Sequence, residues 1–387
     1  MIKESIILLL LVTTVLMAPA EQLYVNAKTG ADANPGTKAQ PLKTIGEAAK
    51  RVNADKEQGA TAIILSEGVY LLTETALFTN NKYTLENRLI IRAEVMPDDT
   101  AWSPQQMPVV VTVAPLAPGI GGEEARGLQM EVSHVTIEGL RFTGSPDYSY
   151  IDGKNLRRSY PVWRDGKNLE DLLITQCLFT GNADVLPLHV GVIANGQGLV
   201  IDHCVFFNCK NPVVFWKADG GTSKHNAMRY CLVFGCYFSG VWTTQSTNGD
   251  DFEFHHNIIA DCNTVWIREN GSTRRYKAHD CIFTGYTNLA GYGSGPLSGT
   301  NVTSTDFLQM ENVQMTGTIQ IEKDQSKRNY LQLKDGSFGA ALKAGLFSKA
   351  LCIRPKSKFP QGKASPGGYF ARAGFRERIR RKPYLSH

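Results

Sequence analysis

The chain of 387 residues has no strong charge excess, since its formal net charge is only +5, which is too weak to suggest a nucleic-acid partner. It contains no zinc, EF-hand, P-loop or dinucleotide motif, so neither a metal nor a cofactor is expected. Beyond the N-terminal segment, no apolar stretch reaches the length of a membrane-spanning helix. Hydrophobic residues make up 42% of the sequence, which is ample for a large core. We expect the protein to be a monomer.

The N-terminal segment has the organisation of a secretory signal peptide. Lys3 gives it a weakly basic start, and residues 6–17 form an apolar run that is too short to span a bilayer comfortably. Ala18, Pro19 and Ala20 then match the small-residue pattern that precedes a cleavage site. We therefore expect residues 1–20 to be removed and the mature protein to be secreted, to an extracellular or a periplasmic location.

The C-terminal residues 351–387 differ from the rest of the chain in charge. They contain ten Lys or Arg residues and a single acidic residue, Glu377. Two interpretations stay open: a solvated tail, and a segment that docks on an anionic polymer or membrane surface. Residues 21–350 are expected to form the folded body.

A short amphipathic helix is predicted over residues 44–53. Thr44 and Glu47 have the spacing of a capping box, in which each side chain satisfies a backbone N–H at the start of the helix. Apolar residues then follow at helical spacing, from Ile45 to Val52. Short strands flank this helix on both sides, so it is expected to close one end of a β-structure.

The same stretch resembles the N-terminal cap of secreted pectin-lyase-like β-helix proteins. The matching residues, in the patterns GTxxxPxxTIxxA and GxY, are Gly36, Thr37, Pro41, Thr44, Ile45, Ala48, Gly68 and Tyr70. The resemblance implies a right-handed parallel β-helix of roughly seven to ten coils, an all-β fold whose open end is plugged by a capping helix. It implies no single activity, because this scaffold carries lyases, hydrolases, esterases and adhesins.

A short motif recurs through the middle of the chain, as TIEGLRFTG at 136–144, ITQCLFTG at 174–181 and IDHCVFFN at 201–208. Stacked coils place equal positions above one another. The first predicted internal column contains Leu140, Cys177, Cys204, Cys236, Asn257, Cys281 and Val313. The second contains Phe142, Phe179, Phe206, Phe238, Ile259, Phe283 and Met315. Cysteines in such a column pack as small apolar groups, so we expect free thiols rather than disulfides.

Two coils align without a gap at an offset of 24 residues. Strand alternation then directs Trp242 and Trp266 outward, whereas the register of the preceding coil leaves open whether Phe215 or Trp216 faces out. The same offset predicts an ionic ladder between coils. Its pairs are Asp250 with Arg274, Asp251 with Arg275, and Glu253 with Lys277.

Outward tryptophans beside cations suit a polysaccharide, because sugar rings stack on indole faces and acidic groups pair with Arg or Lys. Residues 264–271 also resemble the TLxLRHG coil of the alginate lyase and chondroitinase B family, with Glu269 where that family has His. This resemblance implies that Arg268 assists elimination. A Lys is expected on the neighbouring coil, where this chain has Thr244 and Gln245, and Lys217 is the nearest substitute.

A hydrolase would instead need two carboxylates roughly 5–10 Å apart. Glu269, which has no partner in the predicted ladder, is the first candidate, and Asp165, Asp202 and Asp219 are candidates for the second.

His255 and His279 are expected to stack in one outward column, either as a solvated ladder or as part of the site. The predicted catalytic residues are thus Arg268, Glu269 and Lys217. The predicted substrate-binding residues are Trp242, Trp266, Gln245, His255 and His279. Two functions are expected: a polysaccharide lyase or glycoside hydrolase, and, as the alternative, a non-catalytic cell-surface or adhesive β-helix that binds glycan.

Overall fold

The computed structural model describes residues 21–57, 59–119, 122–146, 158–217, 221–293, 295–296 and 307–347, which all belong to one compact unit. The predicted signal peptide and the basic C-terminal tail lie outside the described residues. No helix in the described ranges is long and apolar enough to cross a membrane.

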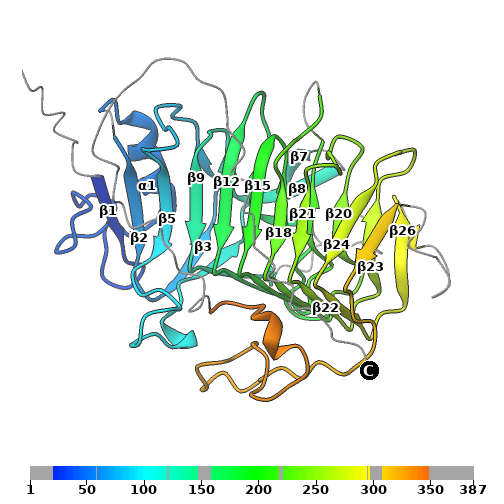
Figure 1. Ribbon diagram of the computed structural model, residues 1–387. Coiled ribbons are helices and arrows are strands. Elements are labelled where there is room, and N and C mark those ends of the chain that lie inside the picture. Colours follow the sequence, from blue (N-terminus) through cyan, green and yellow to red (C-terminus); the bar gives the residue numbers. More distant parts are fainter. Residues whose placement is uncertain are drawn as a thin grey trace, which may run out of the picture. The chain divides into compact units, whose positions relative to one another are not determined.

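Three parallel sheets wind around one core, so that each turn of the chain adds one strand to each sheet (Figure 1). The first sheet consists of β1 (Glu21–Val25), β2 (Thr61–Leu65), β5 (Leu89–Ala93), β9 (Val135–Glu138), β12 (Glu170–Thr175), β15 (Gln197–Asp202), β18 (Ala227–Arg229), β21 (Glu253–His255), β24 (Tyr276–His279) and β28 (Leu308–Glu311). The second consists of β3 (Val69–Leu72), β6 (Val109–Thr112), β10 (Arg141–Thr143), β13 (Leu178–Thr180), β16 (Val205–Phe207), β19 (Leu232–Phe234), β22 (Ile258–Ala260) and β25 (Ile282–Thr284).

The third sheet consists of β4 (Ala76–Phe78), β8 (Gly122–Met130), β11 (Ser159–Arg164), β14 (Val190–Ala194), β17 (Asn211–Phe215), β20 (Ser239–Thr243), β23 (Thr264–Arg268), β26 (Asn288–Tyr292) and β27 (Gly295–Pro296). Only β27 on β26 and the added strand β7 (Ala117–Gly119) on β8 pair antiparallel among the described strands. Two short 3-10 helices, Pro104–Gln106 and Ala340–Leu342, lie outside the sheets. The predicted right-handed parallel β-helix is confirmed.

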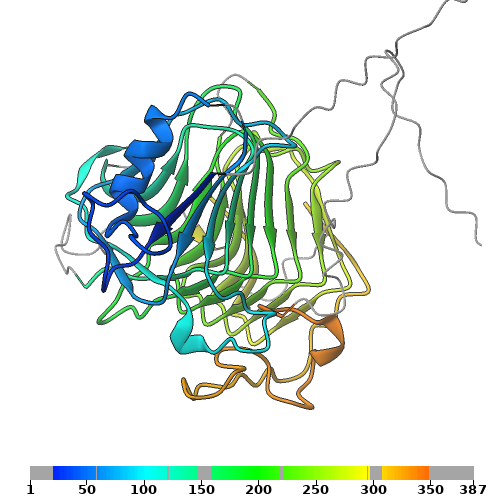
Figure 2. The ribbon, with the colours of Figure 1, turned by 90° about the vertical axis from the view of Figure 1, so that its left-hand side faces the viewer.

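Helix α1 (Ile45–Ala54) closes the N-terminal end, as Figure 2 shows from that side. Its apolar face, including Ile45 and Val52, is buried against the first rungs. The Thr44 hydroxyl accepts the backbone N–H of Glu47 at 3.1 Å, as the capping box predicts. The reciprocal bond differs from the prediction, because the Asp32 carboxylate accepts the Thr44 N–H and Glu47 instead accepts from Arg51.

The internal columns follow strand pairing and correct the prediction at two rungs. Met315, predicted to be internal, is exposed beyond the last complete rung. Pairing of Val205 with Leu232 and of Leu232 with Ile258 aligns Cys204, Cys231 and Asn257. Cys231, not Cys236, therefore occupies that rung, and Val233 rather than Phe238 continues the phenylalanine column. Two adjacent sequences, 231–235 and 236–240, both fit the motif, and only the pairing distinguishes them. Cys236 belongs to a second column, between Cys209 and Cys262.

The cysteine columns lead to a test of thiol accessibility. The seven described cysteines are all buried and free, which confirms the expectation for them, and Cys352 lies outside the described residues. Burial also raises the pKa of the Cys281 thiol to about 12, so little of it is thiolate near neutral pH. We expect these seven thiols to resist a thiol reagent in the native protein and to react after denaturation without a reductant. Disulfides among them in mass spectra of the unreduced protein would contradict the columns.

Residues 317–347, named here the strap, run back along the outer face of the second sheet; they are orange in Figures 1 and 2. The apolar residues of the strap include Ile319, Ile321, Leu331 and Leu346, and they cover Leu178, Val205, Leu232, Ile258 and Ile282. Arg328 extends the contact to the loop at 97–102, where its guanidinium donates to four backbone carbonyls. No sequence pattern predicted this return path.

The predicted ionic ladder is wrong. Glu253 pairs with Arg229 at 3.0 Å, and Lys277 pairs with Glu311, so each carboxylate has a different cation from the one expected. Asp251 lies 3.5 Å from His225, and Arg274 donates to Thr222 and to the backbone of Gln245. The charged residues therefore pair with residues of neighbouring rungs, as predicted, but with other partners. Glu253 and Lys277 stand at equivalent positions of paired strands, yet their side chains pair with Arg229 and Glu311 instead of with each other.

Candidate functional site

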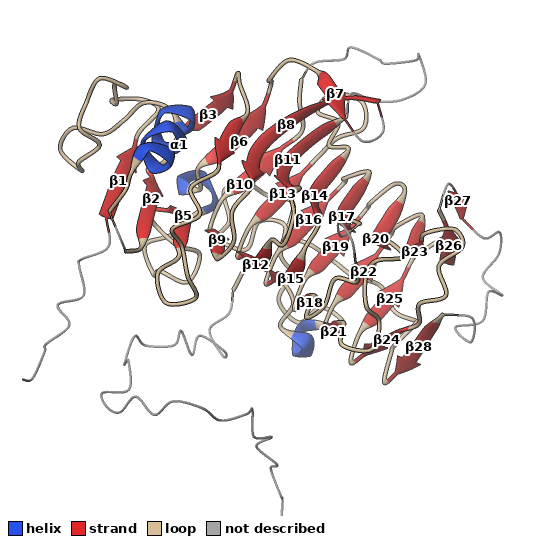
Figure 3. Cartoon of the chain, turned by 90° about the horizontal axis from the view of Figure 1, so that it is seen from above, coloured by secondary structure: helices blue, strands red, loops and turns tan. Residues whose placement is uncertain are grey.

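The outer face of the third sheet carries a row of large aromatic side chains. Strand alternation directs Val162 and Val241 into the core, and it directs Trp163 and Trp242 outward on β11 and β20. The strands that carry the row lie side by side in Figure 3. We name the row the aromatic track: Tyr160, Trp163, Trp216, Phe238 and Trp242.

The N-terminal half of the track is a continuous series of ring and cation contacts. The Arg126 guanidinium lies 4.4 Å from the centre of the Trp163 ring, and Trp163 stacks on Tyr160 at 5.3 Å. Tyr160 in turn lies 5.6 Å from the His189 ring. The His189 Nε2 atom is 3.2 Å from the Lys210 Nζ atom, which links β11 to the start of β17.

The series continues to the exposed part of the track. The Lys210 ammonium lies 5.7 Å from the centre of the Phe238 ring, and Phe238 stacks on Trp242 at 5.8 Å. Phe238, Trp216 and Trp242 are half-buried, whereas Tyr160 and Trp163 are buried. The track therefore crosses the third sheet from β8 to β20 without a break in contact, over about 19 Å at the usual strand spacing.

The two titratable groups at the centre of the track are both held neutral. Burial raises the pKa of Tyr160, and Glu124 adds to this, while Arg158 and Arg126 oppose it. Burial lowers the pKa of His189 to about 3, with a further contribution from the positive charges of Lys210 and Arg158. Near neutral pH, both side chains are hydrogen-bonding groups without charge.

Three predicted site residues meet beside the exposed end of the track. The Lys217 Nζ atom lies 2.7 Å from Oε1 of Glu269, and the backbone N–H of Gln245 donates to the other oxygen at 2.8 Å. Glu269 was expected to lack an ionic partner, and that expectation is wrong, because Lys217 neutralises it. Lys217 keeps 45% of its side chain exposed and lies over the Trp216 ring at 6.0 Å. The structure also determines the register of the coil that contains Phe215 and Trp216, which the sequence left undecided. Phe215 faces the core and Trp216 faces outward.

The prediction that Trp266 faces outward is wrong. Val241 pairs with Trp266, not with Val265, so Trp266 lies in the core and donates to the Thr243 hydroxyl at 3.0 Å. The reason is that the corner loops of the two coils differ in length by one residue. Nine residues separate Thr243 from Glu253 in one coil, whereas eight separate Arg268 from Lys277, the residue level with Glu253, in the next. One residue of slip reverses the face of every side chain in a strand.

The same slip removes Arg268 from the outer face. Arg268 pairs with Thr243 and lies between the rings of Tyr292 and Phe307, at 4.9 and 4.6 Å from their centres. Its guanidinium donates to the backbone carbonyl of Arg274 at 2.8 Å. A role beside Lys217 in elimination is therefore not supported, and the implied correspondence with the lyase coil fails at this residue.

His255 and His279 lie on the first sheet, so they are not part of the aromatic track. They stack at 5.0 Å as the column predicts, and His279 pairs with Asp280. Burial lowers the pKa of His255 to about 4, and the neighbouring His256 contributes to this. No cluster of three or more His, Cys, Asp or Glu able to hold a metal ion occurs in the described part of the chain.

Glu124 and Glu269 do not form a hydrolytic pair. Glu124 on β8 pairs with Arg126 at 2.8 Å, and four strands separate β8 from the end of β23, where Glu269 lies. Five strand spacings amount to about 24 Å, well beyond the roughly 5–10 Å that a pair of glycosidase carboxylates requires. Of the other candidates, Asp202 lies on the first sheet with His203 and Arg229, Asp165 binds Asn195, and Asp219 lies outside the described residues.

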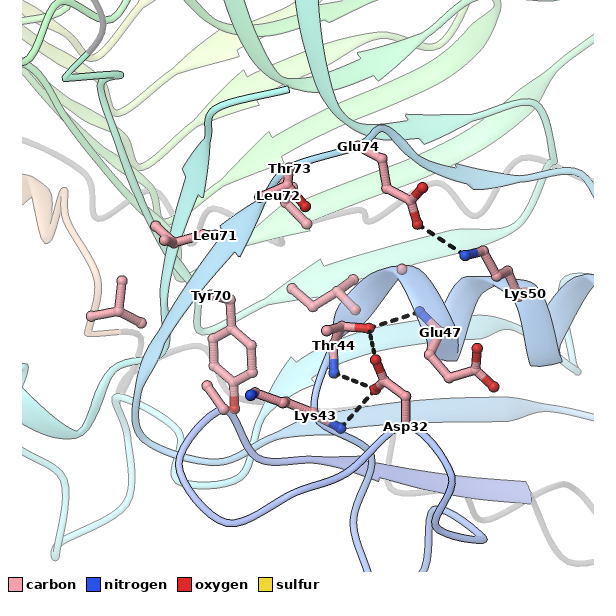
Figure 4. Close-up of a pocket in the computed structure, with 14 residues that line it drawn as sticks. Asp32, Lys43, Thr44, Glu47, Lys50, Tyr70, Leu71, Leu72, Thr73 and Glu74 are labelled. Carbon is pink, nitrogen blue, oxygen red and sulfur yellow. Dashed lines mark hydrogen bonds and ion pairs between the residues drawn. The ribbon is translucent and has the colours of Figure 1, made fainter. Parts of the chain in front are cut away.

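The cap contains a hollow of about 340 Å³ between α1 and β3. Its polar groups already pair with each other, as Figure 4 shows for the carboxylate of Asp32 with Thr44 and for Lys50 with Glu74. These contacts hold the start of the helix and account for the hollow as part of the cap. The aromatic track is thus the stronger candidate for a functional site.

No family model matches the chain, and no curated protein matches it. Among solved structures, it is similar to a rhamnogalacturonan lyase at 12% identity and a TM-score of 0.36, over 85% of this chain and 100% of that one. It is also similar to the pectin methylesterase of Aspergillus niger at 12% identity and a TM-score of 0.37, over 85% and 95%. A mannuronic acid specific polysaccharide family 6 lyase from human gut microbiota shares 12% identity at a TM-score of 0.30, over 80% and 85%.

Proposed function

We propose that the protein binds a polysaccharide along the aromatic track. The observation that carries this proposal is the series of rings and cations on a rigid sheet face, in which Trp216, Phe238 and Trp242 keep part of their rings exposed while Tyr160 and Trp163 are buried. Aromatic faces stack on the apolar faces of sugar rings, and strand stacking repeats such contacts at regular spacing. A linear chain of sugars fits this arrangement better than a compact small molecule does.

The chemistry on the face favours an acidic glycan and a lyase. Cations accompany the track from Arg126 and Arg158 to Lys210 and Lys217, and they suit sugars that carry carboxylate or sulfate groups. Elimination acts on the sugars of this kind that carry a carboxylate, because the carboxylate acidifies the adjacent C–H. Hydrolysis requires a carboxylate pair, and Glu124 and Glu269 are too far apart to form one.

A non-catalytic binding protein is the second candidate. One observation favours it: both Glu124 and Glu269 are neutralised by a cation, which lowers their usefulness in proton transfer. In either case, the proposal includes removal of residues 1–20 and action as a monomer outside the cytoplasm, extracellular or periplasmic.

Incubation with uronate, sulfated and neutral glycans separates these functions. A lyase forms an unsaturated sugar that absorbs in the ultraviolet, a hydrolase forms new reducing ends without that absorbance, and a binding protein retains glycan and forms neither. We expect Trp242→Ala to weaken glycan binding at least about tenfold, the equivalent of about 1.4 kcal/mol. Phe338→Ala, which removes an exposed aromatic ring of the strap, is the matched control and is expected to leave binding unchanged. Equal affinity of Trp242→Ala and the unaltered protein would exclude the track as the site.

A further inference from the structure

Three N–H donors at the centre of the aromatic track have no acceptor. The Nη1 atom of Arg158, the Nε1 atom of Trp163 and the Nδ1 atom of His189 are buried, and none has a hydrogen-bond partner in the described part of the chain. Tyr160 lies between two of them, in ring contact with Trp163 at 5.3 Å and with His189 at 5.6 Å. Buried donors without acceptors are costly, so they indicate a group that the isolated chain does not supply.

The hydrogen-bond network assigns the role of His189. Lys210 is a donor without acceptor capacity, so its contact at 3.2 Å requires Nε2 of His189 to accept. The proton of the neutral ring is then on Nδ1, which is the atom without a partner. Because the pKa of His189 is lowered to about 3, the ring stays neutral through the neutral pH range, and the contact with Lys210 selects this tautomer.

Arg158 differs from Arg126 and Lys217, two other cations of the face. Arg126 is neutralised by Glu124, and Lys217 is neutralised by Glu269. No carboxylate among the described residues forms an ion pair with Arg158. Gly122 makes room for this guanidinium, since a Cβ atom there would lie 2.8 Å from Nη1. Arg158 and His189 are each half-buried, so part of both side chains faces solvent beside the buried donor atoms.

We propose that Arg158, Trp163 and His189 form a subsite for the anionic substituent of an acidic glycan, a carboxylate or a sulfate group. The proposal rests on the proposed function for the glycan, although the anion chemistry is testable without one. The guanidinium supplies the charge and the two ring N–H groups supply directed hydrogen bonds, while the half-buried rings of Phe238 and Trp242, farther along the track, provide the stacking surface. A carboxylate or sulfate offers only acceptors, which is the complement of this set of donors.

Calorimetry on the full chain tests the charge. The ligands are a galacturonate oligosaccharide, a carrageenan oligosaccharide that bears sulfate without carboxylate, and a neutral cello-oligosaccharide. We expect Arg158→Gln to weaken binding of one acidic ligand at least about tenfold and to leave the neutral ligand unaffected; the ligand that responds identifies the anion. Arg275→Gln, at an exposed arginine outside the face, is the matched control. Unchanged affinity in Arg158→Gln, or equal losses for acidic and neutral ligands, would overturn the subsite.

A second measurement separates failure of the subsite from failure of the glycan function. The indole N–H resonance of Trp163 is assigned by its disappearance in Trp163→Phe, with Trp216→Phe as the control that retains it. We expect this resonance to shift on addition of sodium acetate or sodium methyl sulfate, with no dependence on pH between pH 5 and 8. A shift with these ions but no binding of any glycan would retain the subsite and reject the glycan function. No shift with either ion or with an acidic oligosaccharide would reject the subsite.

Discussion

Replacing Trp266 by alanine is expected to lower the free energy of unfolding by about 3–5 kcal/mol, the usual cost of removing a buried aromatic side chain. Trp266 is 0% exposed, and its ring packs 4.7 Å from Phe254 and 5.1 Å from Tyr276. The substitution also leaves the hydroxyl of Thr243 without its donor. Because the surrounding rungs are tied by strand pairing, the cavity cannot collapse fully.

Trp242→Ala is the matched control, since it removes the same side chain from the outer face of the adjoining strand. We expect its cost to be smaller, about 1 kcal/mol, because Trp242 is only half-buried. Chemical denaturation of both variants measures the difference. The opposite order of stability would mean that Trp266 faces outward after all and that the strand register described here is wrong.

Arg328→Ala is expected to release the strap from the second sheet and to lower the free energy of unfolding by about 2–3 kcal/mol. Its guanidinium donates to the carbonyls of Pro97, Asp99, Thr100 and Trp102 at 2.7–3.2 Å. It also lies against the rings of Trp102 and Phe347, at 5.7 and 5.4 Å from their centres. One side chain therefore joins the last segment of the described chain to a loop near its N-terminal rungs.

Limited proteolysis and thermal unfolding measure this effect. Arg328→Lys keeps the charge but loses the planar fork of donors, so we expect it to restore only part of the stability. Lys327→Ala removes an adjacent cation that pairs with Glu322, and we expect no measurable change because the Lys327 side chain is exposed to solvent. Cleavage within residues 317–347 that is no faster in Arg328→Ala than in the unaltered protein would show that the apolar contacts alone hold the strap.

The proposed subsite lies in the part of the track that sequence analysis missed. Arg158, Trp163 and His189 belong to segments without a repeated motif, and none of them stands in a recognisable catalytic spacing. The unpaired donors became visible only when burial and hydrogen bonding were known. Lys217 and Glu269 were predicted as separate candidates, and the structure joins them in an ion pair.

The sequence by itself determined the architecture, because the repeated motif and the cap depend on local chemistry. Strand-forming residues, the capping threonine at Thr44 and apolar positions at helical spacing all favour the same elements. Together with the resemblance of the cap, they predicted the β-helix, and α1 with nearly correct bounds. The burial of cysteines in columns also followed from the motif, although the rung of Cys231 did not.

Only the tertiary structure decided which side chains face outward on each rung. Strand alternation has a period of two, so a single residue more or less in a corner loop reverses the face of a whole strand, as it does for Trp266 and Arg268. Loop length is not encoded in a periodic pattern. The strap and the cluster around His189 depend on contacts between rungs that are distant in sequence. Such contacts form only when the rungs stack, and for this reason the site had to be found in the fold.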